Sequence, residues 1–304
     1  MTILNAGKTK RIVATDNPHL VELQAVDRLT GGDAAKVSEI ASIGVHKTRQ
    51  AANVFTLLNN QGVKTSFVEQ KNETSLLCRH CDMLPLEFVV RRFAFGSFLK
   101  RLKAGDPAAS LDANGKPFRF DEPLFELFHK ESAVMPPLVE APIQMDEGEA
   151  RDQFLVDGKW ADGVYTDPFV DFESDPGTWG IYSAKSPVEG APLMTRAADL
   201  DANELRHVID NIVVPCFKTL EAAWAKVDTA LGPVQLVDMK VELGRDTETG
   251  ELLLADVIDN DSWRVWPGAD PKNQLDKQAF RDGEDMAVVS EKYELVAKLT
   301  ESFR

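Results

Sequence analysis

Charged side chains alternate with apolar ones along VDMKVELG at 237–244. Asp238, Lys240 and Glu242 fall at every second position, and valine, methionine and leucine fill the gaps. Successive side chains of a β-strand point to opposite faces, so the three charges would share one face. A solvated strand surface would explain this pattern, and so would a site that binds a cation and an anion together.

A second apolar run makes this stretch one half of an expected hairpin. RDTETG is rich in turn residues and ELLLADV reads as the returning strand. With the turn centred near Thr249, Glu242 would lie opposite Asp256, on the same face. Mg²⁺ carrying nucleotide phosphates would relieve the repulsion between the two carboxylates. Lys240 could hold a phosphate oxygen, and the alternative is a salt-bridged strand pair with Lys240 as the counter-charge.

Two basic stretches could bind anions. In Gly7-Lys8-Thr9-Lys10, a glycine precedes alternating lysines that enter a strand, so backbone and ammonium groups could approach one anion. It is not a Walker A loop, and a surface turn that carries lysines is the alternative. RRFAFGSFLKR at 91–101 passes from a strand through Gly-Ser into a helix, where free amides and basic side chains can bind a phosphomonoester. The alternative there is a basic stripe on a solvated helix.

The run DVIDNDSWRVW at 256–266 places three acids, one arginine and two tryptophans within eleven residues. That density is unusual for a connecting loop, although tryptophans alone are more often part of a core. Arg264 could bind a second anionic group.

The elements that position these residues follow from hydrophobic spacing. Apolar residues at helical spacing between 51 and 58 predict a helix that ends at Gly62. Short strands are expected at 12–13, 20–23, 63–70, 74–80 and 86–92. Residues 1 to about 85 should therefore form an α+β unit with antiparallel pairing.

The rest of the chain is expected to be a surface region followed by helices. Between 131 and 193 the sequence is rich in proline, glycine and acids, with a small hairpin expected at 154–165. A long helix is predicted at 199–227 with a kink at Pro215, and a last helix at about 284–302.

Composition limits the classes of protein that are possible. The 304 residues, 43% hydrophobic, exceed one ordinary core. The net charge of −15 argues against nucleic-acid binding through the overall field. Three cysteines cannot form a disulfide framework, and Cys78 and Cys81 lack a second pair for zinc. With no leader and no apolar run long enough for a bilayer, a soluble cytoplasmic protein without a membrane partner is expected.

Together these stretches resemble the phosphoribosylaminoimidazole-succinocarboxamide synthase (SAICAR synthetase) family, closest to its animal-type synthetase domain. The resemblance covers roughly residues 1–130 and 195–304. The matching runs, in the family's order, are GKTKRIV, DRLTGGDAAK, LEFVVRRFAFGSFLKR, LVDMKVELG, LADVIDNDSWRVWP and LDKQAFRD.

The resemblance implies a mixed α+β and α/β, ATP-grasp-like fold with a kinase-like antiparallel amino-terminal sheet. A subdomain at 1–85 would cover ATP, and 86–304 would form the catalytic subdomain with a surface insertion at about 133–166. A homo-oligomer is implied as well.

The resemblance also implies roles for individual residues. Asp238 and Lys240 would be catalytic, and Glu242 and Asp256 would hold Mg²⁺. The residues implied for ATP are Lys8, Lys10, Met83 (in the Cys81–Leu84 connection beside the adenine), Lys130, Glu242 and Asp256. Those implied for the substrates are Asp33, Arg91, Ser97, Lys100, Arg101, Arg264, Lys277 and Arg281.

The implied reaction begins with ATP converting the carboxylate of carboxyaminoimidazole ribonucleotide into an acyl phosphate. The amine of L-aspartate then displaces phosphate, giving SAICAR, ADP and phosphate. Metal and lysines would stabilise charge on the transferred phosphoryl group, and arginines would orient the nucleotide.

Two stretches depart from the family pattern. Lys130 is followed by Glu131-Ser132 rather than by a Lys-Asp-Asp run with a nearby Asp-Pro, which Asp167-Pro168 could supply beyond the insertion. The usual Gly-Lys-Gly loop reads SIGVHKT at 42–48. Both departures concern the acceptor amine.

Three alternatives to the synthetase stay open. The first is a ligase of the same fold that uses another amine or azole. The second is an inositol-phosphate-like kinase, although GSFLKR and DSWR have no reason to exist in that family. The third is a non-catalytic nucleotide-binding relative, which Lys8, Lys10, Glu242 and Asp256 argue against.

Overall fold

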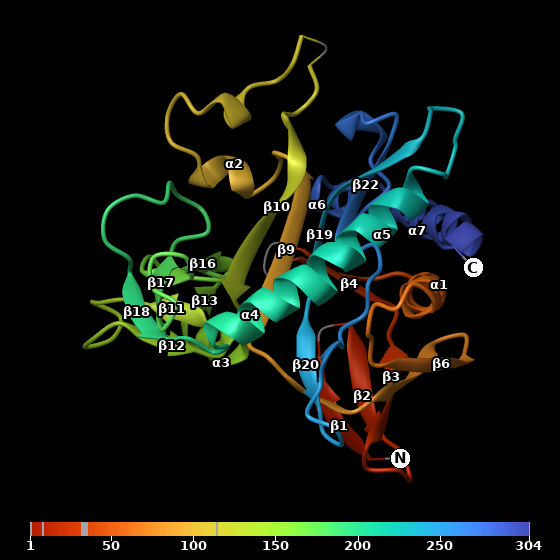
Figure 1. Cartoon of the computed structure of the whole chain (residues 1–304), viewed down its shortest axis with the longest axis horizontal. Helices are drawn as coiled ribbons and strands as arrows, with labels where there is room; N and C mark the ends of the chain where they lie inside the picture. Colours follow the sequence, from red (N-terminus) through yellow and green to blue (C-terminus); the bar gives the residue numbers. More distant parts are fainter. Residues whose placement is uncertain (1, 8, 32–35, 114, 304) are drawn as a thin grey trace. The chain divides into compact units, whose positions relative to one another are not determined.

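The computed structural model describes residues 2–7, 9–31, 36–113 and 115–303. The chain divides into two compact units: Met1–Leu84 with Asn211–Arg304 (unit 1), and Pro85–Asp210 (unit 2) (Figure 1). The boundary near residue 85 is shared with the predicted subdomains, whereas residues 211–304 are grouped with the amino-terminal segment. The division into ATP-covering and catalytic subdomains stays a prediction.

An antiparallel sheet and helix α1 (Ile43–Asn60) organise the first part of unit 1. Val13, Val21 and Leu23 are buried, and α1 packs against this sheet through Ala51, Val54, Phe55 and Leu58. The sheet order is β1 (Ile3–Ala6), β2 (Lys10–Ala14), β3 (Leu20–Ala25), β7 (Ser75–Arg79) and β6 (Phe67–Asn72). The predicted antiparallel pairing within this segment is confirmed.

Helix α1 begins and ends where its local chemistry changes. The Asp27 carboxylate accepts the N–H groups of Ser42 (3.1 Å) and Gly44 (2.9 Å), which satisfies amides that an α-helix leaves unpaired at its start. Beyond its end, Gly62 adopts a positive φ of 80°. The predicted last helix is also confirmed, as α7 (Met286–Leu299) followed by η4 (Thr300–Phe303).

The charged stretch lies in β19 (Val234–Val241) and at the start of β20 (Leu243–Asp246). β19 pairs with β22 (Trp263–Pro267), and β20 lies between β21 (Leu252–Leu254) and β8 (Cys81–Met83). The remaining elements of unit 1 are β4 (Arg28–Gly31), β5 (Lys36–Glu39), α5 (Val214–Trp224), η3 (Pro271–Asn273) and α6 (Gln278–Arg281).

The expected hairpin forms, but its predicted register was wrong by one residue. Leu243 pairs with Leu254, and the Ala255 N–H donates to the Glu242 carbonyl (3.0 Å), so Ala255 rather than Asp256 lies opposite Glu242. The Asp246 carboxylate accepts two amides of the turn, from Glu248 (2.8 Å) and Thr249 (2.9 Å). This side-chain-capped turn sets the register.

Unit 2 contains an antiparallel sheet whose strand order is β18-β17-β16-β10-β9. All residues of β9 except Glu87 are buried, which explains why its sequence lacks polar alternation. The elements are β9 (Leu86–Phe93), α2 (Phe98–Arg101), η1 (Pro107–Ala109), β10 (Arg119–His129), β16 (Phe169–Asp171), β17 (Thr178–Tyr182), β18 (Met194–Ala197) and α4 (Ala202–Val208).

The acidic insertion has its own small elements. β13 (Leu155–Val156) and β14 (Lys159–Trp160) form the predicted hairpin, with positive φ at Asp157 and Gly158. Residues 164–165, expected in the same hairpin, instead form β15 (Val164–Tyr165), which pairs with β11. The other elements here are β11 (Ser132–Val134), β12 (Ile143–Met145) and α3 (Glu147–Phe154).

The predicted helix at 199–227 is α4, then a π-helical turn η2 (Ile209–Val213), then α5. Pro215 lacks an N–H, so the regular hydrogen bonding cannot continue through it, and the wider turn directly precedes it. In the described part of the chain, no helix has both the length and the apolar character needed to cross a membrane.

Candidate functional site

The loop between β21 and β22, residues 256–262, brings a predicted phosphate-binding lysine to a predicted metal ligand. Lys10, at the start of β2, forms an ion pair with the Asp256 carboxylate. Asp256 Oδ1 also accepts the Val257 N–H (2.8 Å). Tertiary folding thus joins two residues that lie 246 positions apart in the sequence.

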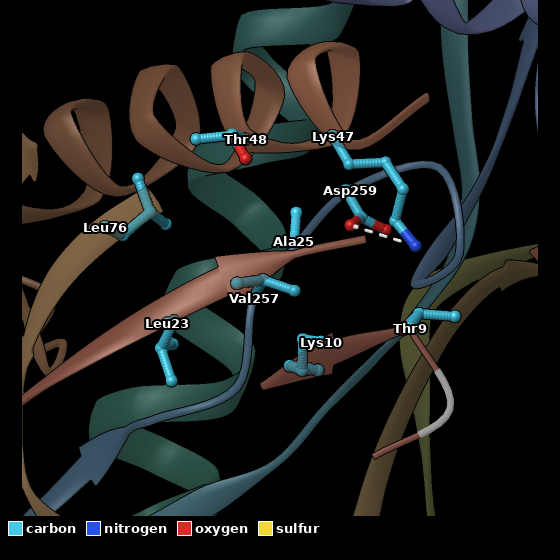
Figure 2. A pocket seen from close by; sticks show the side chains of 9 residues that line it. All are labelled: Thr9, Lys10, Leu23, Ala25, Lys47, Thr48, Leu76, Val257 and Asp259. Carbon is cyan, nitrogen blue, oxygen red and sulfur yellow. Dashed lines mark ion pairs between the residues drawn. The ribbon is translucent and has the colours of Figure 1, made fainter. Parts of the chain in front are cut away.

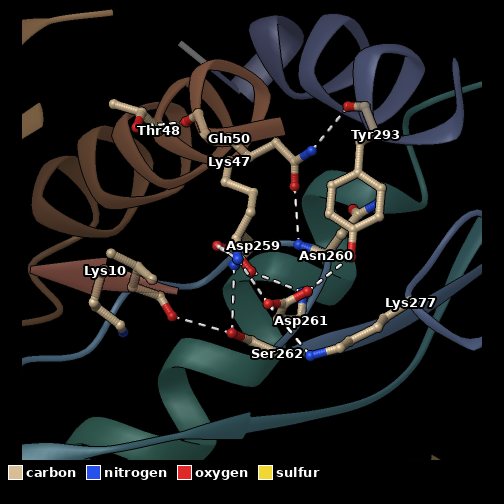
Figure 3. A network of polar contacts seen from close by, with 12 residues as sticks. Lys10, Lys47, Thr48, Gln50, Asp259, Asn260, Asp261, Ser262, Lys277 and Tyr293 are labelled. Carbon is tan, nitrogen blue, oxygen red and sulfur yellow. Dashed lines mark hydrogen bonds and ion pairs between the residues drawn. The ribbon is translucent and has the colours of Figure 1, made fainter. Parts of the chain in front are cut away.

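The same loop buries two further carboxylates around a lysine of α1. Lys47 is 4% exposed, and its Nζ lies 2.7 Å from Asp261 Oδ2 and 4.0 Å from Asp259 Oδ2. Lys277 Nζ lies 3.4 Å from Asp261 Oδ2, and the Tyr293 hydroxyl donates to Asp261 Oδ1 (2.7 Å). Figure 3 shows this Lys47 network converging on the loop from several elements.

Burial and charge act against each other in the Lys47 network. Burial opposes the charged form of Lys47, but Asp261 and Asp259 together raise its pKa. For Asp261, Lys47 and Lys277 outweigh burial and lower the pKa, whereas burial raises the pKa of Asp259. Burial also raises the pKa of the Tyr293 hydroxyl, with Asp261 adding to the shift. Lys47 and Asp261 are therefore a charged pair at neutral pH.

Hydrogen bonds to α1 and β19 hold the second half of the loop. Gln50 Oε1 accepts the Asn260 N–H (3.0 Å), and Asn260 Nδ2 donates to the Leu275 carbonyl (2.9 Å). The Ser262 carbonyl accepts the Lys240 N–H (2.7 Å). Since the loop is anchored to α1 and to β19, its carboxylates have fixed directions.

A pocket opens beside this loop (Figure 2). Apolar side chains of β3 and β7 form part of its wall, and two lysines and one buried carboxylate form the charged part. Its lining residues are Thr9, Lys10, Leu23, Ala25, Lys47, Thr48, Leu76, Val257 and Asp259. Such a mixture suits a ligand with both an apolar and a charged portion.

The charges of VDMKVELG are not a solvated strand face. Asp238 and Glu242 are buried, and Asp238 Oδ2 accepts a hydrogen bond from Arg264 Nη1 (2.6 Å). Lys240 is half-exposed, with its Nζ 3.9 Å from Glu242 Oε1. Asp276 Oδ2 accepts the N–H of Val265 (3.3 Å), the residue after Arg264. Burial raises the pKa of Asp276 to about 6, although the charge of Arg264 opposes the shift.

Met83, expected beside the adenine, lies on β8 and is paired with Gly244 of β20. A Cβ at Gly244 would lie 2.7 Å from Cys81 Cβ, so only glycine permits this approach of the two strands. The Met83 side chain is exposed.

The predicted phosphomonoester residues lie in unit 2. β9 delivers Arg91, and Gly96 (φ 66°) turns the chain into α2. Arg91 and Arg101 are both buried and both bind Glu126. Burial lowers the pKa of Arg101, with Glu126 opposing that shift. Lys100 is exposed on α2.

The chain beyond the insertion returns to Lys130. The His129 N–H donates to the Pro168 carbonyl (3.0 Å), and Phe128 pairs with Phe169. The structure therefore places Asp167-Pro168 beside the end of β10, as the sequence allowed.

Other predicted residues are brought together only in part. Lys277 joins Asp261, whereas Arg281 is exposed on α6 and donates to Gln278 (3.3 Å). Lys8 and Asp33 lie outside the described residues. The residues predicted for the phosphoribosyl substrate are divided between the two units, so one shared site for them stays a prediction.

The sequence analysis missed several residues of this region. Lys47 and Thr48 stand in the departing stretch SIGVHKT, where a lysine on the buried face of a helix was the available signal. Asp259 and Asp261 belong to the acid-rich run that was singled out, without a role for each. Among the residues that the structure describes, no group of three or more His, Cys, Asp or Glu is arranged to hold a metal ion.

The chain is similar to known proteins over nearly its whole length. The family model described as SAICAR synthetase matches residues 3–149 and 193–299. The phosphoribosylaminoimidazole-succinocarboxamide synthase of Chloroflexus aurantiacus is 36% identical over 98% of this chain and 95% of its own length. The Multifunctional protein ADE2 of Gallus gallus is 30% identical over 98% of this chain and 58% of its own length.

Solved structures show the same fold. The phosphoribosylaminoimidazole-succinocarboxamide synthase of Ehrlichia chaffeensis aligns with a TM-score of 0.66 at 22% identity, over 99% of both chains. A SAICAR synthetase in complex with ADP aligns with a TM-score of 0.66 at 24% identity, over 97% of this chain and 96% of that one. The fold class expected from the sequence is thereby confirmed.

Proposed function

This chain belongs to the SAICAR synthetase family, and on that premise we propose that it is an ATP-dependent ligase of de novo purine biosynthesis. It joins L-aspartate to the carboxylate of carboxyaminoimidazole ribonucleotide through an acyl phosphate. The products are SAICAR, ADP and phosphate.

The observation that carries the proposal is the approach of Lys10 and Lys47 to the acid-bearing loop in one pocket. Lysine ammonium groups near a pocket can neutralise the phosphates of a nucleotide, and an adjacent carboxylate can share a cation with them. A solved SAICAR synthetase with the same fold is in complex with ADP, which supports nucleotide binding by this chain.

The donor set in this region fits Mg²⁺. Mg²⁺ is usually held by one or two carboxylates together with substrate phosphates, and Glu242 and Asp256 supply hard oxygen donors near Lys10 and Lys240. When bound, Mg²⁺ would neutralise charge on the phosphates as a Lewis acid. Its coordination by these two residues is part of the proposal.

The chain's own residues have distinct tasks in this mechanism. Lys10 and Lys240 neutralise charge on the transferred phosphoryl group. Asp238 holds the Arg264 guanidinium (2.6 Å), so that Arg264 can orient the carboxylated substrate. Arg91, Ser97 and the basic residues of α2 bind the phosphate of the ribonucleotide.

Further parts of the proposal come from the family. The protein acts in the cytoplasm as a homo-oligomer, and Met83 borders the adenine. Lys130 contacts ATP, and Asp33, Lys277 and Arg281 contact the substrates.

The experiment measures ADP release by the purified protein with ATP, Mg²⁺ and carboxyaminoimidazole ribonucleotide. L-aspartate is compared with a panel of amines and with no amine. We expect release to require both the ribonucleotide and aspartate, and the mass of the product to match SAICAR. ADP release with the ribonucleotide but without any amine, together with a stable phosphorylated nucleotide as the product, would contradict the ligase and indicate a kinase.

A ligase with another acceptor amine is the second candidate. It is favoured by the two departures from the family pattern, Glu131-Ser132 after Lys130 and SIGVHKT at 42–48. Ribonucleotide-dependent release that requires a different amine from the panel would establish that candidate.

A further inference from the structure

One carboxylate lies between the two buried arginines of unit 2. Glu126 is 5% exposed, and its two oxygens bind different partners. Oε2 accepts from Arg91 Nε, and Oε1 accepts from Arg101 Nη2. Both oxygens are thus used to join two guanidinium groups.

The three side chains come from three elements of unit 2, the strands β9 and β10 and the helix α2. Glu126 lies on β10 opposite Val89, and Leu124 of β10 lies opposite Arg91 of β9. Arg101 is the last residue of α2. Strand pairing thus places Glu126 and Arg91 on neighbouring strands, and the Glu126 carboxylate joins them to Arg101 at the end of α2.

Arg101 is held on its other sides as well. Its Nη1 donates to the carbonyls of Ser97 (3.1 Å) and Ala184 (3.0 Å), and its guanidinium lies 4.9 Å from the ring centroid of Phe128 and 5.4 Å from that of Phe169. Aromatic faces attract a cation without fixing its orientation, whereas a hydrogen bond to a carboxylate is directional. Glu126 and the two carbonyls therefore fix the direction of the Arg101 fork, and Glu126 is the charged member of that set.

Two buried guanidinium groups would repel each other without a counter-charge. A carboxylate that binds both lowers this repulsion and leaves the cluster of two arginines and one glutamate with a net positive charge. Such a cluster can still attract a phosphate dianion, and the planar forks then approach it in fixed directions.

We propose that Glu126 is a positioning residue that orients Arg91 and Arg101 to bind the phosphate of the ribonucleotide substrate. This inference rests on the proposed function, since it takes that phosphate as the ligand. Glu126 does not contact the phosphate, because like charges would repel.

The test compares Glu126→Gln and Glu126→Asp with a matched control. Gln keeps the size but turns an amide NH₂ toward one arginine, and Asp keeps the charge with a shorter reach. Glu122→Gln makes the same change at an exposed position of the same strand. Each variant is assayed with the ribonucleotide and with the corresponding ribonucleoside, which lacks the phosphate.

We expect Glu126→Gln to raise KM for the ribonucleotide by about 100-fold, since misplacing a binding group costs roughly that factor. The kcat, KM for ATP and KM for the ribonucleoside should change little, so preference for the phosphorylated substrate is lost. Glu126→Asp should recover part of that preference, and Glu122→Gln should match the wild type.

Two results would overturn the inference: an unchanged KM for the ribonucleotide, or equal losses for both substrates, which indicate a merely structural role. Melting temperatures are measured for each variant, and if Glu126→Gln does not fold, Glu126→Asp carries the same comparison. The preference of each protein for ribose 5-phosphate over ribose can also be measured by competitive binding, which needs no turnover. It therefore tests Glu126 even if the wild type fails to make SAICAR.

Discussion

At the scale of single residues, the acids of this protein are positioned by specific basic partners. Asp238 binds Arg264, Asp256 binds Lys10, and Asp261 binds Lys47. A buried carboxylate without a partner would be strongly unfavourable. Each partner therefore helps to set where the acid lies.

The first prediction concerns Asp256. Asp256→Asn removes the charge that pairs with Lys10 and would share Mg²⁺ with the nucleotide. We expect kcat to fall by about 10²- to 10³-fold, the usual cost of one electrostatic group in an active site. Glu242→Gln should act similarly, and Asp16→Asn, at an exposed turn, should not. Steady-state ADP release provides the measurement, and wild-type turnover in both site variants would count against the metal assignment.

The second prediction concerns pH and Asp261. Its pKa is lowered from the ordinary 3.8 in the folded protein, so ionised Asp261 stabilises the fold above about pH 4 and that stabilisation is lost as the pH falls toward the folded value. The free energy of unfolding of Asp261→Asn should therefore fall below wild type most at about pH 7, and the difference should shrink toward about pH 3.

Urea unfolding at several pH values measures this difference. Asp276, with its pKa raised to about 6, has the opposite sign: its folded form gains stability as the pH falls. Because Asp276 is present in both proteins, its effect cancels in the comparison. A difference that stays constant over this pH range would contradict the assignment.

At the scale of elements, helix α1 carries the contacts that hold the 256–262 loop. Lys47 reaches the carboxylates of the loop, and Gln50 accepts the Asn260 N–H and donates to the Tyr293 carbonyl (2.9 Å) of α7. One helix thus connects the acid-bearing loop with the carboxy-terminal helix. The first residues of α1 belong to SIGVHKT at 42–48, the stretch that departs from the family pattern, and Lys47 is part of it.

The third prediction tests this connection. Lys47→Met removes one partner of a buried ion pair, and such changes cost about 3–5 kcal/mol of stability. The matched control is Arg49→Met on the same helix. It removes an exposed ion pair between Arg49 and Glu301 and should cost about 0–1 kcal/mol of stability.

Denaturant unfolding measures both variants. In the double variant Lys47→Met/Asp261→Asn, the two losses should not add, because residues in one ion pair are coupled. Additive losses would show that the two side chains act separately.

At the scale of the whole molecule, each compact unit holds a different part of the proposed chemistry. Unit 1 contains the pocket with Lys10 and Lys47, and unit 2 contains the Arg91 and Arg101 cluster. The insertion belongs to unit 2, where its far end returns to the end of β10.

The fourth prediction is that Mg²⁺ and ATP together stabilise the folded chain. A ligand that binds only the folded state at about 100 times its Kd adds roughly 2.7 kcal/mol, so the Tm should rise by several degrees. EDTA should remove most of this rise, and adenosine should give a smaller shift that does not depend on the metal. Thermal unfolding with each addition measures the change in Tm. A rise in Tm with ATP that EDTA does not reduce would contradict a metal ion bound together with the nucleotide.

Much of this protein could be read from local sequence pattern. Short apolar runs bounded by turn residues predicted β2, β3, β7 and β9, and helical spacing predicted α1 and α7, because helical spacing reflects a single buried face. The matching motifs indicated the family, and Lys10 and Asp256 were each named as candidate site residues, although their contact was not predicted. The one-residue error between Glu242 and Asp256 came from the Asp246 turn, whose capping chemistry shifts the register.

Only the tertiary structure decided the rest, because contacts between distant segments leave no periodic signal. Nothing local in SIGVHKT says that Lys47 meets Asp261, 214 residues away. Glu126 likewise reads as one polar residue in the apolar run 124–128 until β9, β10 and α2 pack together. The buried charges are compatible with folding only through those partners, so the sequence supplies the groups and the packing of the elements assigns their roles.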